Sequence, residues 1–164
     1  MTDVNILINR IDQVLEVEVK RGSVAWTETV QATRDREQRL QRYEPVAKHI
    51  IDLLKPRMEA FIERFKDVVR AEPSVRQHTR AMHLTFAATV AKVSLTFEVY
   101  PNRDVSQIRL ECTQEIVPVL VSYDKQLVLE IPLDAVRDDV VVQWFDERIL
   151  AFVKTYLAIV RQDA

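Results

Sequence analysis

Apolar residues recur at steps of three and four along the first half of the chain. The most regular run lies between residues 34 and 70 and keeps its phase past Pro45 and Pro56. Steps of three and four bring side chains to one face of an α-helix. The pattern therefore predicts a helical region over residues 1–72 with one long apolar face. That face consists of Leu40, Tyr43, Ala47, Ile50, Leu54, Met58, Phe61, Phe65 and Val68.

The two prolines decide what kind of helix this region forms. Proline inside a helix costs about 3 kcal/mol and bends it, but Glu44 and Lys55, which precede the prolines, are poor caps for a new helix. A straight helix over residues 34–70 would measure about 55 Å, whereas a compact chain of this length is roughly 40 Å across. We therefore expect a bent helix or a short helical series, with the sharper break at Pro56.

The N-terminal segment also has helical spacing. Its apolar positions between residues 4 and 15 follow the same steps, with Thr2 or Asp3 available as the N-cap. Gly22 could end this helix, and a second helix is expected to begin between Ser23 and Thr29. The alternation in "LEVEV" leaves a short hairpin with "VAW" as the alternative, although we favour a helix.

Beyond a connector at residues 71–80, the period of apolar residues changes from 3.6 to 2. Short alternating runs separated by turns predict an antiparallel meander of four or five strands over residues 80–132. Pro118 cannot donate a ladder hydrogen bond, so its strand is expected to be bulged or at an edge.

The last element is a predicted amphipathic helix over residues 138–161. Asp138 or Asp139 is available as its cap, and its broad apolar face predicts packing on the sheet. We expect the polar residues of this helix, such as Arg148, to lie mostly outside that apolar face. We therefore expect an α+β fold in a single domain, 1–164: a helical region, an antiparallel sheet and a closing helix.

Composition excludes several kinds of chemistry. Gly22 is the only glycine in 164 residues, so phosphate-binding loops, which need several glycines, are absent. Cys112 is the only cysteine, which rules out an intrachain disulfide and fits a reducing, cytoplasmic setting. The first residues do not resemble a signal peptide, and no apolar run approaches the length of a membrane span.

Candidate catalytic and metal-binding residues are scattered. His78 and His83 are five residues apart and His49 is distant, so we predict no metal site and no cofactor. Cys112 alternates with apolar neighbours and is interpreted as a core thiol. We name no catalytic residue and favour a non-enzymatic protein, although an active site assembled from distant residues stays open.

The arginines between residues 34 and 42 are the positions most open to a binding role. Acidic residues lie among them, and the formal net charge of the chain is −2. A nucleic-acid surface would need a clustered basic stripe. We therefore expect a solvated, ion-paired helix and no nucleic-acid partner.

Two hypotheses about function follow. The first is a protein-interaction or oligomeric adaptor module, because the apolar face is longer than one small sheet can cover; its candidate interface is Leu40, Tyr43, Ala47, Ile50, Leu54, Met58, Phe61 and Phe65. The order of elements resembles that of helix-on-sheet chaperone and adaptor modules, a likeness that assigns no residue. The alternative is a carrier or sensor of a small apolar ligand, bound between the sheet and the last helix. Its candidate pocket residues are Phe86, Phe97, Trp144, Phe145, Phe152 and Tyr156.

Overall fold

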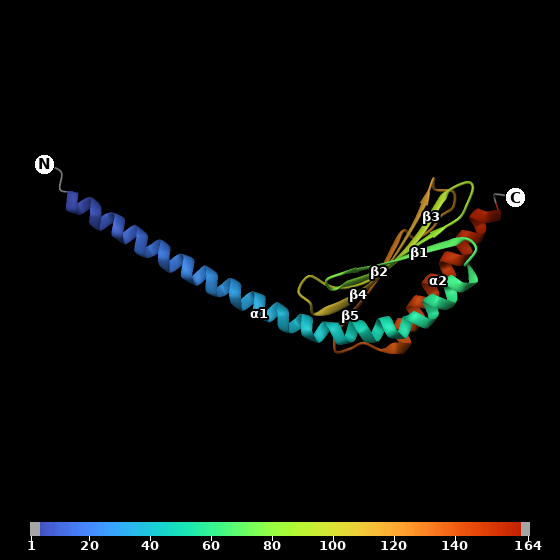
Figure 1. Cartoon of the computed structure of the whole chain (residues 1–164), viewed down its shortest axis with the longest axis horizontal. Helices are drawn as coiled ribbons and strands as arrows, with labels where there is room; N and C mark the ends of the chain where they lie inside the picture. Colours follow the sequence, from blue (N-terminus) through green and yellow to red (C-terminus); the bar gives the residue numbers. More distant parts are fainter. Residues whose placement is uncertain (1–3, 162–164) are drawn as a thin grey trace. The chain divides into compact units, whose positions relative to one another are not determined.

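The computed structural model describes residues 4–161 and confirms an α+β fold. A long helix comes first, a five-stranded antiparallel sheet follows, and a second helix closes the chain (Figure 1). The elements are α1 Val4–Arg64, β1 Val69–Arg76, β2 Thr79–Phe86, β3 Lys92–Pro101, β4 Gln107–Val117, β5 Gln126–Pro132 and α2 Asp138–Val160. The chain divides into two compact units, the first ending at Gln38 and the second beginning at Arg39. We describe each unit by itself.

The first unit is helical throughout its described residues. Three predictions are therefore wrong. The helix does not end at Gly22, no new helix begins between Ser23 and Thr29, and no hairpin forms there. A single glycine inside a helix costs only about 1 kcal/mol relative to alanine, too little to end it. Threonine hydroxyls also bond back to carbonyls one turn earlier, as from Thr27 to Ser23 at 2.9 Å. The predicted caps Thr2 and Asp3 lie outside the described residues.

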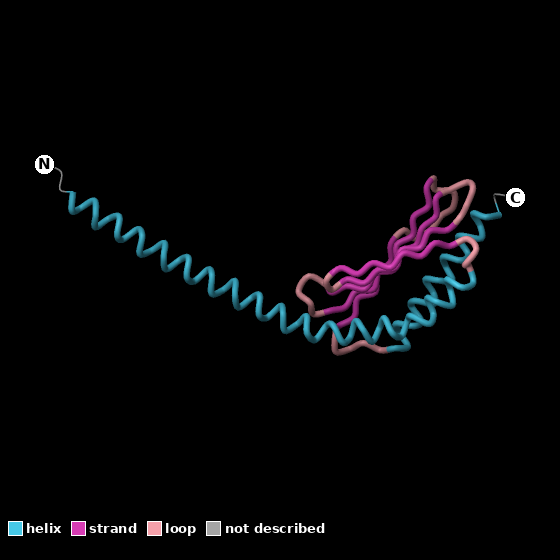
Figure 2. Tube along the Cα trace, viewed as in Figure 1, coloured by secondary structure: helices cyan, strands magenta, loops and turns pink. Residues whose placement is uncertain are grey.

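In the second unit, α1 continues through both prolines to Arg64, and it curves along the sheet (Figure 2). The bent helix is confirmed, whereas the break at Pro56 and the helical series are not found. Pro45 and Pro56 are eleven residues apart, about three turns, so they share one side of the helix. Both prolines are exposed. The carbonyls that lose their helical partners are thus on the solvent side, where water can bind them and where helices are normally convex.

The sheet is a meander in the order β1-β2-β3-β4-β5, and every neighbouring pair is antiparallel. The segment interpreted as a connector at residues 71–80 instead contains most of β1, a tight turn, and the first residues of β2. Pro73 is tolerated because β1 is an edge strand. Pro118 belongs to no strand, contrary to expectation, because β4 ends at Val117.

One face of the sheet carries the core. Alternate residues of β3 and β4 are buried, and both α2 and the second-unit part of α1 cover that face (Figure 1). This confirms that the last helix packs on the sheet. The two helices run in the same direction. His49 of α1 contacts Asp138 of α2 at 2.7 Å. Eight residues further along each helix, Arg57 contacts Asp146 at 2.8 Å.

Two details of α2 differ from expectation. Its N-cap is Arg137, without a side-chain capping bond, and Asp138 and Asp139 lie in the first turn instead. Arg148 falls between the buried residues Phe145 and Phe152 on the helix repeat and is itself only partly exposed. It therefore lies on the sheet-facing side of α2 and not among the solvated residues.

Candidate protein-interaction surface

Most of the large exposed apolar side chains of the first unit lie on or beside one face of α1, while Ile6, Val17 and Val24 lie on the opposite side. We call this face the seam and define it by the three-four steps that lead back from Leu40 to the start of the helix. The seam consists of Val4, Ile8, Ile11, Leu15, Glu18, Gly22, Ala25, Thr29, Ala32 and Arg36. Its four large apolar residues are 47–66% exposed. Leu7, Val14 and Trp26, which border the seam, are exposed as well.

The seam continues the pattern of the buried part of α1. From Arg36 the same steps lead to Leu40, Tyr43 and Ala47, and the last two are buried in the core. Every described residue from Val4 to Thr29, by contrast, is exposed. One and the same helical pattern is therefore covered by the sheet in the second unit and left uncovered in the first.

Glycine is unusual inside such a helix. A Cβ built on Gly22 would meet no atom within 4 Å, so no described contact of this chain requires a glycine there. A glycine inside a helix that survives its propensity cost commonly has a packing reason. Within the described residues that reason is missing.

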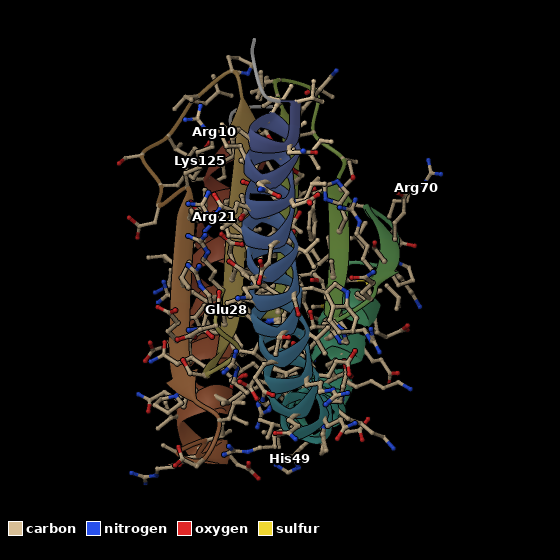
Figure 3. The ribbon with its side chains drawn as sticks, turned by 90° about the vertical axis from the view of Figure 1, so that its left-hand side faces the viewer. Arg10, Arg21, Glu28, His49, Arg70 and Lys125 are labelled. Atoms are coloured by element: carbon tan, nitrogen blue, oxygen red, sulfur yellow. The ribbon has the colours of Figure 1, made fainter. Side chains whose placement is uncertain are left out.

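Charges surround the seam in nearly equal numbers. Between residues 4 and 38 there are five Lys and Arg residues and six Asp and Glu residues. Exposed pairs such as Lys20–Glu16 at 3.5 Å and Arg21–Glu18 at 3.8 Å join neighbouring turns. Arg10, Arg21 and Glu28, labelled in Figure 3, are spaced by eleven and seven residues and so follow one side of the helix. The segment offers no basic stripe for phosphate groups.

A second surface lies within the second unit, where a groove of about 410 Å³ runs between α1 and the strands β1 and β2. Its apolar lining includes Ile51, Met58, Val75, Met82, Phe97 and Phe145, while Asp52, Lys55 and Arg80 contribute charges. The groove exists because β1 extends past the cover of the helices. Val75, on the core-facing side of β1, is consequently 69% exposed.

Beside this groove lies a hollow of about 600 Å³ next to Pro45. Arg80 and Ile51 line both spaces. In the hollow, Nδ1 of His78 is 2.5 Å from a carboxylate oxygen of Glu44. The hydroxyl of Tyr43 donates a 3.0 Å hydrogen bond to the His78 carbonyl and so fixes the β1–β2 turn on α1. Burial is the main reason that the pKa of Tyr43 is raised, so this hydroxyl stays protonated and able to donate.

The structure places the eight candidate interface residues in the core of their own chain. Tyr43, Ala47, Ile50, Leu54, Met58 and Phe61 are buried, and Leu40 and Phe65 are partly buried against them. The sheet and α2 cover most of the surface of these side chains, so they do not form a continuous exposed face. The uncovered continuation of the same pattern is the seam.

The six candidate pocket residues do not line one common space. The rings of Phe86, Phe152 and Tyr156 pack on one another, with centroids 4.6 Å apart for Phe86–Phe152 and 5.2 Å for Phe86–Tyr156. Trp144 is partly buried against the core. Of the six, only Phe97 and Phe145 line the groove described above, and their ring centroids are 4.8 Å apart.

The titratable residues are dispersed. His49, His78 and His83 contact Asp138, Glu44 and Thr96 respectively, and no two of them share a site. In residues 4–161, no three side chains of the His, Cys, Asp or Glu type are grouped as metal ligands would be. Cys112 is buried, as predicted, and burial raises the pKa of its thiol to about 12. A buried thiol that stays protonated is not an activated nucleophile.

Sequence reasoning noticed the apolar spacing of residues 4–15 but did not select it as a surface. The available signals were the in-phase continuation of the repeat and the isolated Gly22. Both signals become informative only once the structure shows that the later positions of the repeat, from Leu40 onward, are packed against the sheet and α2.

Comparisons with protein-family models, curated proteins and solved structures return no match. Among the described helices, none combines the length and apolar character required to cross a bilayer.

Proposed function

We propose that this protein is a non-enzymatic protein-interaction module that binds its partner through the seam of α1. One observation carries the proposal: large apolar side chains lie exposed along one face of a helix whose same face is buried further along the chain. Exposed apolar patches of this kind on soluble proteins mark interaction sites.

The energetics indicate how much of the helix a partner covers. Full burial of a Val, Leu or Ile side chain contributes about 1.5–3 kcal/mol, so a side chain that is already half covered adds about 1 kcal/mol. The six large residues from Val4 to Leu15 in and beside the seam would thus supply roughly 6 kcal/mol. Association itself costs about 4–15 kcal/mol. A stable complex therefore requires contacts well beyond the first three turns.

The charge pattern favours a protein over a membrane surface or a nucleic acid. Helices that lie in a membrane interface carry mainly Lys and Arg on their polar face, and nucleic-acid surfaces are strongly basic. The first unit has a slight excess of acids. The partner that best complements the seam is therefore a protein with an apolar helical surface and charges of both signs around it.

The test compares two variants of the full chain, tagged and expressed in the cells from which the sequence comes. Leu15→Glu places a charge in the seam, whereas Gln13→Glu places the same charge on the opposite side of the helix. We expect proteins recovered with the wild type, a second copy included, to be retained by Gln13→Glu and lost with Leu15→Glu. Identical recovery with both variants would contradict the proposal.

A second candidate function is binding of a small apolar ligand in the groove beside β1. Its support is the groove's volume, which lies within the 300–1,000 Å³ typical of ligand sites, and its apolar lining with Arg80 at one end. Native mass spectrometry of the purified chain is expected to detect a bound small molecule that is lost in Met82→Trp, a variant that fills the groove. Unmodified masses for both proteins, even after incubation with single-chain fatty acids, would refute this candidate.

A further inference from the structure

The two halves of the seam differ in side-chain size. The first half holds the large residues Val4, Ile8, Ile11 and Leu15, while the second half holds the small residues Gly22, Ala25, Thr29 and Ala32 and ends with the long side chain of Arg36. Glu18 lies between them. Helices pack well where large residues face small ones, because each layer is then filled without overlap. A helix face with large side chains at one end and small ones at the other therefore fits a second copy of itself that runs in the opposite direction.

We propose that a second copy of this chain covers the seam, with the two α1 helices antiparallel. This inference rests on the proposed function and names its partner. In this arrangement Ile8 faces the partner's Ala32, Ile11 faces the partner's Thr29 and Leu15 faces the partner's Ala25. Two-fold symmetry repeats each layer on the other side of the axis, which passes midway between Glu18 and Gly22 of the seam.

The layer next to the axis accounts for the glycine. Glu18 faces the partner's Gly22, where the missing side chain leaves room for the carboxylate stem. Arg21, which already lies 3.8 Å from Glu18 in its own chain, then lies beside the partner's Glu18 too. The two acids and two cations at the axis neutralise one another, so the charged layer carries no net charge.

One flank of the seam is complementary towards its ends, whereas near the axis it brings Arg21 close to the partner's Arg21, between the two Glu18 carboxylates. In an antiparallel pair, each side of one helix meets the same side of the other. Arg10 and Glu28 share one side of α1 (Figure 3), so Arg10 approaches the partner's Glu28, and the symmetric pair forms at the other end. Exposed pairs of this kind contribute little affinity, but they disfavour the wrong orientation.

A parallel pair fits less well. It would place Glu18 against the partner's Glu18 and Arg36 against the partner's Arg36, which are like charges in the seam. It would also stack large residues on large ones at one end and leave Gly22 opposite the partner's Gly22, which creates voids.

The oligomeric state of the purified full chain is the first measurement. Light scattering coupled to size exclusion, from about 1 to 200 µM, is expected to give twice the 19.1 kDa mass of one chain at the upper concentrations. A constant mass of one chain would overturn the inference. The proposed function would still stand if a different protein is recovered through the seam in the experiment with Leu15→Glu and Gln13→Glu.

Orientation is tested by cysteine cross-linking. The native Cys112 is buried and does not compete. Ile8→Cys and Ala32→Cys are expected to form a disulfide-linked dimer only when the two proteins are mixed. The pair Gln13→Cys and Gln31→Cys, on the side of α1 opposite the seam, is expected to form none. Cross-linking of each seam variant with itself, without mixing, would show a parallel pair and overturn the antiparallel inference while leaving the seam as the interface.

The role of the glycine provides an independent test. A Cβ at position 22 meets no atom of the isolated chain within 4 Å, whereas the ring of Gly22→Phe overfills two layers of the antiparallel pair. We expect the dissociation constant to rise at least tenfold for Gly22→Phe and less than twofold for the matched control Ser23→Phe, which lies off the seam. Circular dichroism confirms that both variants keep their helix. Equal dissociation constants for Gly22→Phe and the wild type would contradict the proposed register.

Discussion

Two isoleucines in the same helical repeat should respond in opposite ways to truncation. Ile50 is fully buried in the second unit, whereas Ile11 in the first unit is 47% exposed. We consider Ile50→Ala and Ile11→Ala, which delete the same atoms. The measured quantity is the free energy of unfolding of the second unit.

For Ile50→Ala the loss has two parts. The three deleted carbon groups account for about 2.5 kcal/mol at ~0.8 kcal/mol each. An unfilled cavity of at most about 80 Å³ adds up to about 2 kcal/mol. The expected loss is therefore about 2.5–4.5 kcal/mol, a large share of the 5–15 kcal/mol typical of a domain.

For Ile11→Ala no described core contact is lost, and alanine has the higher helix propensity by a few tenths of a kcal/mol. The unfolding free energy should stay within about 0.5 kcal/mol of the wild type. Any larger effect that grows with protein concentration would reflect association through the seam rather than packing within one chain.

Urea titration followed by tryptophan fluorescence measures both variants. Trp26→Phe serves as the common background, so that Trp144 in α2 reports on the second unit alone. The interpretation of α1 would be refuted if Ile11→Ala destabilised the second unit by more than about 1 kcal/mol at micromolar concentration. It would equally be refuted if Ile50→Ala cost less than about 1 kcal/mol.

Three further outcomes are expected in the second unit. Tyr43→Phe removes the hydrogen bond to the His78 carbonyl and should lower the unfolding free energy by about 0.5–1.5 kcal/mol in urea titrations; an unchanged value would mean that water replaces the bond. A double-mutant cycle on Arg57→Gln and Asp146→Asn should give a coupling of only about 0.2–1 kcal/mol, since both side chains are over 40% exposed; a value above 2 kcal/mol would contradict this. Because burial raises the pKa of the Cys112 thiol to about 12 from 9.0, the folded chain keeps this proton between about pH 9 and 12 while the unfolded chain loses it. Its contribution to stability should therefore fall as pH rises through that window, more steeply in the wild type than in Cys112→Ala, and a thiol reagent at pH 8 should label the chain only in urea.

Much of the secondary structure could be predicted because it depends on local spacing. The change from steps of three and four to alternation marks the border between helix and sheet, and the 138–161 helix was recognised from its apolar face. The unbroken phase through Pro45 and Pro56 predicted a bent helix or a short helical series, and the structure has the bent helix. β1 was missed because Pro73 and its charged neighbours are typical of a loop, and only its place at the sheet edge makes a strand possible there.

The candidate surface shows where local pattern stops being informative. Ile11 and Ile50 belong to one repeat and follow the same rule of spacing, so the sequence determined that both lie on the apolar side of α1. Which of them is buried depends on where the sheet packs, and that is set by contacts between residues far apart in the chain. The tertiary structure places the sheet's single apolar face against residues 40–65. It thereby covers the interface that the pattern suggested and leaves the earlier half of the same helix without a cover.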